Sequence, residues 1–342
     1  RKDHRNLAEP MADKVYFAGE AANPDRNSSV HAALESGRSV ARQVAASGHK
    51  RIGVIGAGVS GLVAAHAMSN AGLDVHVIEG RDRIGGRINT DRSLGFAADL
   101  GASWLHGIDG NPLTAVVKQA GMRKFVYDPN GIARVKGREI SLNNLPNWAY
   151  DILQYDNHAG TENGTLNKWA YLWTSDYSGD EWLFPDGYDQ ILTQFEGGYE
   201  LSLNERVNAV DYNSNKVRVT SNISVRNFDA VIVTVPLGVL KVGHIAFDPV
   251  LPDEKQQAID RLGYGTLDKI YLQFDEVFWD ADVQNIVTPF TDYPRGYYNS
   301  WMNLYPVTGE PVLICFNGGP AASALSSETD ENVVGQALST IL

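Results

Sequence analysis

The stretch "RIGVIGAGVSGLVAAHAMSNAGLDVHVIEG", residues 51–80, decides the fold. An apolar run over residues 51–55 leads into a glycine turn, small and apolar residues continue to Gly72, and a second apolar run ends at Glu79. The order strand, turn, helix, strand is that of a βαβ unit, in which the two strands lie parallel. The sequence therefore predicts an α/β fold.

The glycine turn has the spacing of a dinucleotide site. Gly56, Gly58 and Gly61 follow the first strand directly and open the predicted helix. The first glycine permits the tight turn, the second lets backbone N–H groups approach a pyrophosphate, and the third lets the helix sit close to the sheet. Glu79 ends the next strand 18 residues after Gly61, where a carboxylate accepts hydrogen bonds from a ribose diol. We therefore predict a Rossmann-like nucleotide-binding domain.

The next stretch, "EGRDRIGGRINT", residues 79–90, adds a second arm to this site. Arg81, Arg83 and Arg87 surround the pair Gly85–Gly86, so guanidinium donors and bare backbone face a diphosphate from its other side. A plain nicotinamide domain does not need this arm. The chain here resembles the flavin amine oxidase family, in which a GxGxxG unit is followed by E-x-R-x-R-x-G-G-R and the cofactor is FAD.

Four further stretches extend the resemblance. "ADLGASWLHGIDGNPL" (98–113) resembles the segment that passes the flavin ring in polyamine oxidases, and "VIVTVPLGVLK" (231–241) resembles the strand and loop that return to the FAD domain. "GYGTLDKIYLQFDEVFWD" (263–280) resembles the segment that bears the family's lysine. "VYFAGEA" (15–21) resembles the last FAD-contacting element, which lies at the C-terminal end in the family.

The resemblance implies an α/β fold with a glutathione-reductase-type FAD domain, joined to a mixed-sheet and helical substrate domain. Because the family's closing element comes first here, it also implies a chain that is circularly permuted, naturally or by engineering, and shortened in its substrate region. The FAD-binding domain would comprise residues 1–95 and 184–240, and the substrate-binding domain residues 96–183 and 241–342.

The resemblance also implies which residues meet a non-covalently held FAD. Glu20 binds the ribityl chain, Val30 offers its backbone N–H to the pyrimidine end of the ring, and the backbone of Val207 meets adenine. Lys269 is linked through a water to flavin N5, where it assists reoxidation by oxygen. His106 either touches the substrate amine or is a structural hydrogen-bonding group. The expected cofactor contacts are Gly56, Gly58, Gly61, Glu79, Arg81, Arg87, Gly101, Ala102, Ser103, Trp104, Val207, Glu20 and Val30, and the expected catalytic residues are Lys269 and His106.

Other side chains stay open between a core role and a site role. Cys315 is predicted to be a buried strand residue and not a point of covalent flavin attachment, and no metal site is expected. Aromatic residues can bind a cationic amine through their faces or pack in a core. The candidates are Trp104, Trp173, Trp182, Tyr188, Tyr297, Tyr298 and Trp301.

The remaining pattern predicts helices at residues 28–46, 253–261 and 330–342 and poorly defined helices between 96 and 190. Strands are predicted between 199 and 235, and "KIYLQFD" and "PVLICFNGG" are predicted strands of a second sheet.

Charge and composition narrow the possible partners. The formal net charge of −12 argues against nucleic acid. The chain lacks an apolar run of the roughly 18 residues that cross a bilayer, shows no signal peptide and has a single cysteine. We expect a cytoplasmic protein of unknown oligomeric state.

The function implied by the resemblance is FAD-dependent oxidation of a polyamine-like amine. The imine formed is hydrolysed to an aldehyde and a smaller amine, and O2 is reduced to hydrogen peroxide. One alternative is an L-amino-acid oxidase or another flavin oxidoreductase, which needs an arginine to clamp the carboxylate; Arg123, Arg134 and Arg295 are the candidates. A second alternative is a rearranged FAD-binding scaffold with little or no turnover.

Overall fold

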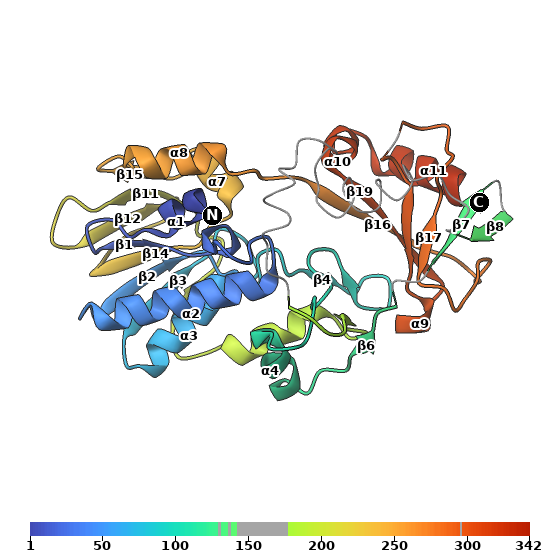
Figure 1. Cartoon of the computed structure of the whole chain (residues 1–342). Helices are drawn as coiled ribbons and strands as arrows, with labels where there is room; N and C mark the ends of the chain where they lie inside the picture. Colours follow the sequence, from blue (N-terminus) through green and yellow to red (C-terminus); the bar gives the residue numbers. More distant parts are fainter. Residues whose placement is uncertain (129–130, 136–137, 142–176, 295) are drawn as a thin grey trace.

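The computed structural model describes residues 1–128, 131–135, 138–141, 177–294 and 296–342. Figure 1 shows two parts. A parallel sheet flanked by helices and by a smaller sheet forms one end, and a six-stranded sheet with its own helices forms the other. The region around β4 and α4 lies between them.

The parallel sheet contains the predicted βαβ unit. β2 (Arg51–Ile55) and β3 (Asp74–Ile78) pair in parallel, and α3 (Val59–Asn70) connects them. The apolar residues of both strands are buried, as a sheet covered on both faces requires. The predicted α/β fold is confirmed. The strand order is β1 (Val15–Phe17), β14 (Ala230–Val233), β2, β3 and β10 (Glu200–Ser202).

The N-terminal segment belongs to this sheet. β1 pairs in parallel with β14, a short 3-10 helix (η1, Glu20–Ala22) follows, and α2 (Val30–Ala46) packs along α3. The Ser29 hydroxyl caps α2 by accepting from the Ala32 N–H at 3.2 Å, as the sequence indicated. This packing is the arrangement that the expected permutation requires, and the permutation itself stays a prediction.

A second sheet covers the face of the parallel sheet that lies opposite α2 and α3 (Figure 1). Its order is β13 (Val225–Phe228), β12 (Val217–Ser221), β11 (Val207–Asp211) and β15 (Ala246–Asp248). Phe228 fills the space between the sheets: a Cβ at Gly53 of β2 would lie 2.8 Å from its ring, so only glycine fits there. The predicted strand region 199–212 is thus two strands, β10 and β11, in different sheets.

Three helices complete this end: α1 (Lys2–Ala8), α7 (Leu237–Lys241) and α8 (Asp253–Arg261). The buried Lys255 of α8 joins α8 to α1. Its Nζ donates to the carbonyl oxygens of Asn6, Leu7 and Glu9 at 3.0, 2.7 and 2.7 Å. These are carbonyls that the end of a helix leaves without partners.

The far end is a six-stranded sheet. The predicted strands and the C-terminal helix are confirmed there, and Cys315 is a buried residue of β19 as expected. The order is β16 (Leu267–Gln273), β19 (Val312–Gly318), β18 (Ser300–Asn303), β17 (Asn285–Val287), β7 (Gly131–Val135) and β8 (Arg138–Ser141). Its helices are α9 (Tyr305–Thr308), α10 (Gly319–Leu325) and α11 (Asp330–Ile341).

Between the two ends, the helices expected in residues 96–190 can be followed only in the described part of that range. It contains α4 (Pro112–Gln119), the start of the 3-10 segment η4 (Tyr188–Phe195), and short strands; residues 142–176 lie outside the described residues. The short pairs are β4 (Thr90–Asp91) with β5 (Ala98–Asp99) and β6 (Phe125–Val126) with β9 (Trp182–Leu183). No helix in the described part of the chain combines the length and apolar character that spanning a bilayer requires.

Candidate active site

The glycine turn has the geometry that a pyrophosphate site needs. Gly56 has φ +107°, which favours glycine, and a Cβ at Gly61 would lie 2.1 Å from the Gly56 carbonyl oxygen. Around Gly58, by contrast, an added Cβ would meet nothing within 4 Å. The turn is therefore closed beneath Gly61, where helix meets sheet, and open above Gly58, where a ligand would lie.

Glu79 lies beside this turn. One carboxylate oxygen accepts the Ala57 N–H at 2.7 Å, and the other accepts the Arg81 N–H at 2.9 Å. These bonds fix the carboxylate at the end of β3, close to the open face of Gly58. It keeps acceptor capacity for a diol, since each carboxylate oxygen has two lone pairs.

The second arm folds back on the turn. The Gly85 N–H donates to the Ala57 carbonyl at 2.8 Å, and a Cβ at Gly86 would lie 3.2 Å from the Gly58 Cα. Arg83 stabilises the arm itself, because its guanidinium donates hydrogen bonds to carbonyls of the same loop at 3.1 to 3.2 Å. The structure thus places both glycine elements at one point.

Arg87 leaves this arm and reaches the N-terminal segment. Its guanidinium, about half exposed, donates to the buried Glu20 carboxylate at 2.9 Å. The Ser28 N–H donates to the other Glu20 oxygen at 2.8 Å, just before Val30 begins α2. Glu20, Arg87 and the start of α2 are therefore neighbours, although 67 residues separate Glu20 from Arg87 in sequence.

Lys269 on β16 meets the segment that contains Gly101 and Ser103. Its Nζ donates to the carbonyl oxygen of Asp99 at 2.8 Å, to that of Gly101 at 2.5 Å, and to the Ser103 hydroxyl. Ala102 anchors the same segment to the second arm, because its N–H donates to the Arg87 carbonyl at 3.0 Å. On residue pattern alone Lys269 suits a solvent-facing edge strand, and the structure shows it turned inward.

Burial changes the acidity of this lysine and of its neighbour. Desolvation lowers the pKa of Lys269 to about 8, against the opposing attraction of Asp99. Desolvation raises the pKa of the Asp99 carboxyl to about 6, although hydrogen bonds from Thr90 and from the Tyr188 N–H oppose it. Perturbed pKa values of this kind gather at functional sites, so the pair supports this location.

An aromatic wall adjoins Lys269. Its Nζ lies 5.5 Å from the centre of the Trp104 ring and 6.0 Å from that of Phe316. The His106 ring stacks on Trp104 at 6.2 Å between centres, and His106 Nδ1 lies 3.2 Å from a Glu181 carboxylate oxygen. Aromatic faces beside a carboxylate provide what a cationic amine binds.

Val207, the expected adenine contact, is buried at the start of β11. Most of the described aromatic candidates for substrate binding are buried core residues. Tyr188, Tyr298 and Trp301 are fully buried core residues, Trp182 is buried under Lys124, and Tyr297 packs against the core of the six-stranded sheet. Trp173 lies outside the described residues. Among the aromatic candidates that the structure describes, only Trp104 lies at the Lys269 site.

Sequence reasoning did not single out Asp99, Glu181 or Asn111. Asn111 caps α4 through the Leu113 N–H at 3.0 Å and donates to the His106 and Gly107 carbonyls at 3.1 and 2.9 Å, which fixes the loop that bears His106. Its position before Pro112 is a recognisable capping signal. Nothing local marks Glu181, whose partner His106 lies 75 residues earlier.

The sequence of residues 1–45, 59–146 and 142–341 matches the profile of the family described as flavin containing amine oxidoreductase. The chain belongs to this family. It is an FAD-dependent amine oxidase, as the sequence resemblance implied.

Individual relatives agree with this assignment. The chain is 32% identical to "Probable polyamine oxidase 4" of Arabidopsis thaliana over 81% of its own length and 68% of that protein, and 31% identical to "Polyamine oxidase 5" of Oryza sativa subsp. japonica over 84% and 70%. A solved double mutant of putrescine oxidase has the same fold, with a TM-score of 0.61 at 18% identity, over 85% of this chain and 80% of that one.

The residues present fit FAD. The turn is open above Gly58, two glycine elements meet there, and the Glu79 carboxylate lies beside them, where a ribose diol could bind. Arg87 binds Glu20 through its side chain and the Ala102 N–H through its carbonyl, and the neighbouring Gly101 carbonyl accepts from Lys269. When bound, FAD supplies the acceptor for the electron pair of the substrate's C–H bond; this chain supplies binding, orientation and the charge around the ring.

Proposed function

We propose that the substrate is a polyamine-like amine. The observation that carries this proposal is the His106–Glu181 pair, at 3.2 Å, beside the Trp104 ring and its neighbour Lys269. A carboxylate and an aromatic face suit the second ammonium group of a polyamine, while the amine to be oxidised enters uncharged next to the ring. The names of the relatives support the same substrate class.

We propose roles for the chain's residues on the same basis. Gly56, Gly58, Gly61, Glu79 and Arg81 would hold the adenosine diphosphate half of FAD, with Val207 at the adenine. Further along, Arg87, Glu20 and Val30 would hold the ribityl chain and the pyrimidine end of the ring. The segment Gly101–Trp104 would line the ring, with Lys269 above it as the group that assists reoxidation.

The domain division is also a proposal, and the packing suggests a refinement. β15 pairs with β11, and α8 packs on α1, so residues 246–261 lie with the FAD-binding end. A boundary after Arg261 follows the packing more closely than the expected one at residue 240.

The amino-acid oxidase alternative has less support. The Arg123 guanidinium is paired with both oxygens of Asp186 at 3.0 and 2.6 Å, and Arg134 pairs with Glu139 at 3.5 Å under the Phe278 ring. Two of the three candidate arginines are thus engaged with the chain's own carboxylates. Arg295 lies outside the described residues.

The test is anaerobic bleaching of the flavin absorbance by spermine, spermidine, putrescine, a monoamine and L-amino acids. We expect bleaching by spermine or spermidine at the lowest concentrations. Bleaching by L-amino acids alone would favour the amino-acid oxidase, and a flavin spectrum that no compound bleaches would favour a scaffold without turnover.

A variant localises the substrate site. Glu181→Gln should raise the KM for spermidine about tenfold, since it removes one ion pair of roughly 1 kcal/mol or more in a partly desolvated site. The matched control is Glu254→Gln, an exposed carboxylate on α8. Equal KM values for the two variants would contradict the proposed amine position.

A further inference from the structure

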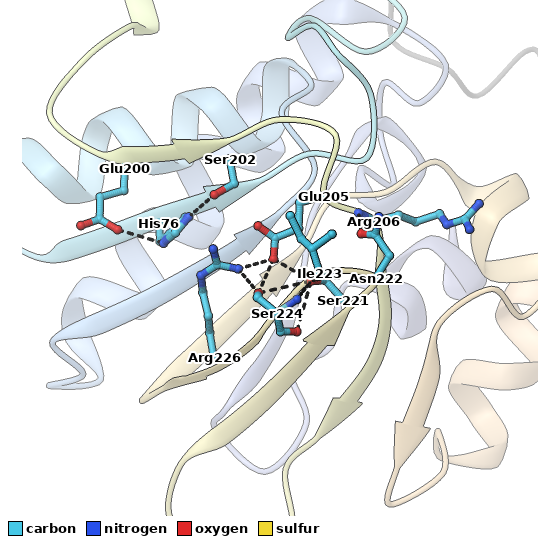
Figure 2. Close-up of polar contacts among 10 residues, drawn as sticks. All are labelled: His76, Glu200, Ser202, Glu205, Arg206, Ser221, Asn222, Ile223, Ser224 and Arg226. Atoms are coloured by element: carbon cyan, nitrogen blue, oxygen red, sulfur yellow. Dashed lines mark hydrogen bonds and ion pairs between the residues drawn. The ribbon is translucent and has the colours of Figure 1, made fainter.

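A buried carboxylate lies behind the adenosine end of the proposed cofactor site. Glu205, in the loop between β10 and β11, is 1% exposed. One of its oxygens accepts hydrogen bonds from the Ser221 hydroxyl at 2.7 Å, from the Ser224 hydroxyl and from the Arg226 guanidinium. Figure 2 shows these three side chains converging on Glu205: Ser221 from the end of β12, Ser224 from the turn that follows, and Arg226 from β13.

This network fixes a turn against a loop. Asn222, at the tip of the turn, forms two hydrogen bonds with the backbone of Arg206 (Figure 2). Its Oδ1 accepts the Arg206 N–H at 2.7 Å, and its own N–H donates to the Arg206 carbonyl at 3.0 Å. The turn is therefore bound to the side chain of Glu205 and to the backbone of Arg206. The pairing of β11 with β12 is irregular directly after this point, between Val207 and Ala209.

The same loop is joined to the ribose side of the site. The Glu205 N–H donates to the Glu79 carbonyl at 2.8 Å, and the Asn204 N–H donates to the Arg81 carbonyl at 2.8 Å. Asn204 has φ +55°, a conformation that asparagine adopts more readily than most residues. Residues 204–207 thus connect the backbone of Glu79 with Val207.

We infer that Glu205 is a positioning residue for the adenosine half of FAD. It would act by holding residues 204–207 so that the Val207 backbone and the Glu79 carboxylate keep a fixed separation. The inference rests on the proposed cofactor contacts of Glu79 and Val207.

The energetics favour a positioning role over a gain in stability alone. A buried carboxylate is costly to desolvate, and burial by itself raises the pKa of Glu205. Opposing effects outweigh burial and lower this pKa to about 2: the hydrogen bonds from Ser221, Ser224 and Arg226, and the positive charge of Arg226. Replacing such a network by apolar side chains is often neutral for stability. Its specific effect is to define one geometry for the turn and the loop.

The test measures ligand affinity of the full chain after FAD has been removed. Glu205→Gln keeps the size of the side chain and an acceptor for the serines, but loses the charge that holds Arg226. We expect the Kd of FAD, measured by quenching of flavin fluorescence, to rise about tenfold, the effect of losing one charge-assisted hydrogen bond. The Kd of AMP should rise by a similar factor, because the disturbance lies at the adenosine end.

Two further variants complete the design. The double variant Ser221→Ala/Ser224→Ala keeps the buried charge pair, should raise both Kd values in the same direction, and replaces Glu205→Gln if that protein does not fold. Glu200→Gln is the matched control: this carboxylate on β10 is largely exposed and contacts His76 at 3.0 Å (Figure 2), without touching the loop. It should leave both Kd values unchanged.

Glu79→Gln tests the proposed cofactor site separately from the role of Glu205. If Glu79→Gln weakens FAD binding while the Glu205 and serine variants lower only the thermal midpoint, Glu205 has a structural role and the inference is wrong. If Glu79→Gln leaves the Kd of FAD unchanged, the proposed cofactor site is wrong and the inference falls with it.

Discussion

Replacing Lys269 by methionine should change the pH dependence of stability in a predictable direction. Burial lowers the pKa of Lys269 from 10.5 to about 8 in the folded protein. Between these two values the unfolded chain binds more protons than the folded one, so raising the pH favours folding. The contribution of Lys269 to the free energy of unfolding is therefore lowest below pH 8 and increases across this window.

The magnitude follows from the shift. Each pKa unit corresponds to about 1.4 kcal/mol, so from pH 8 to pH 9.5 the contribution of Lys269 grows by about 2 kcal/mol. Below pH 8, Lys269→Met loses three hydrogen bonds but also relieves the desolvation of an ammonium group, so these effects partly offset each other. Asp99 and Ser103 have other partners among the described residues, which limits the loss further.

The assay is urea unfolding of the native protein and of Lys269→Met at pH 7 and pH 9.5. The stability difference, native minus variant, should increase by about 2 kcal/mol between the two pH values. Lys255, whose pKa burial also lowers to about 8, is present in both proteins and cancels in the difference. Lys118→Met, at an exposed position on α4, is the control and should show no such increase. A pH-independent difference for Lys269→Met would refute the buried, ionisable lysine.

Two other predictions use the same protein. Gly61→Ala places a Cβ 2.1 Å from the Gly56 carbonyl oxygen and should lower the free energy of unfolding by about 1–3 kcal/mol. Gly58→Ala meets no atom within 4 Å, so it should leave the free energy of unfolding unchanged while weakening FAD binding. Equal free energies of unfolding for the two variants in urea would contradict the predicted difference between them. Lys255→Met leaves the three carbonyls at the end of α1 without their ammonium donor and should cost about 2–4 kcal/mol, with faster amide hydrogen exchange in α1 than in α3; unchanged exchange in α1 would show that Lys255 does not hold it.

The glycine turn, the proposed cofactor site, was predictable from sequence because its geometry is local. Gly56, Gly58, Gly61 and Glu79 lie within one βαβ unit, so their spacing alone defines the turn, the helix start and the strand end. The boundaries of α8 and α11 were predictable for similar reasons, since Pro252 and the apolar period mark them.

The contacts of Lys269 and His106, the proposed catalytic residues, were not predictable from residue pattern. Lys269 alternates as an edge-strand lysine would, and only the resemblance indicated a role for it. Its partners lie 166 to 170 residues away, and Glu181 and His106 lie in separate loops. Such contacts depend on how the sheets pack, which composition and periodicity do not encode. The same reason explains why residues 199–212 divide between two sheets.

The strand order of the parallel sheet has a consequence for the order of folding. Among the strands that the structure describes, β1 pairs with β14 alone, so residues 15–17 pair with residues 231–233, which come much later in the sequence. During synthesis the β2–α3–β3 unit has its own partners at once, whereas the N-terminal strand must wait until more than 200 further residues have left the ribosome. Contacts this distant in sequence slow folding, because the intervening chain must lose its freedom first. Residues 15–17, synthesised long before their partner strand, are thus among the last of this sheet to find their place, and the apolar "VYF" stays exposed until then.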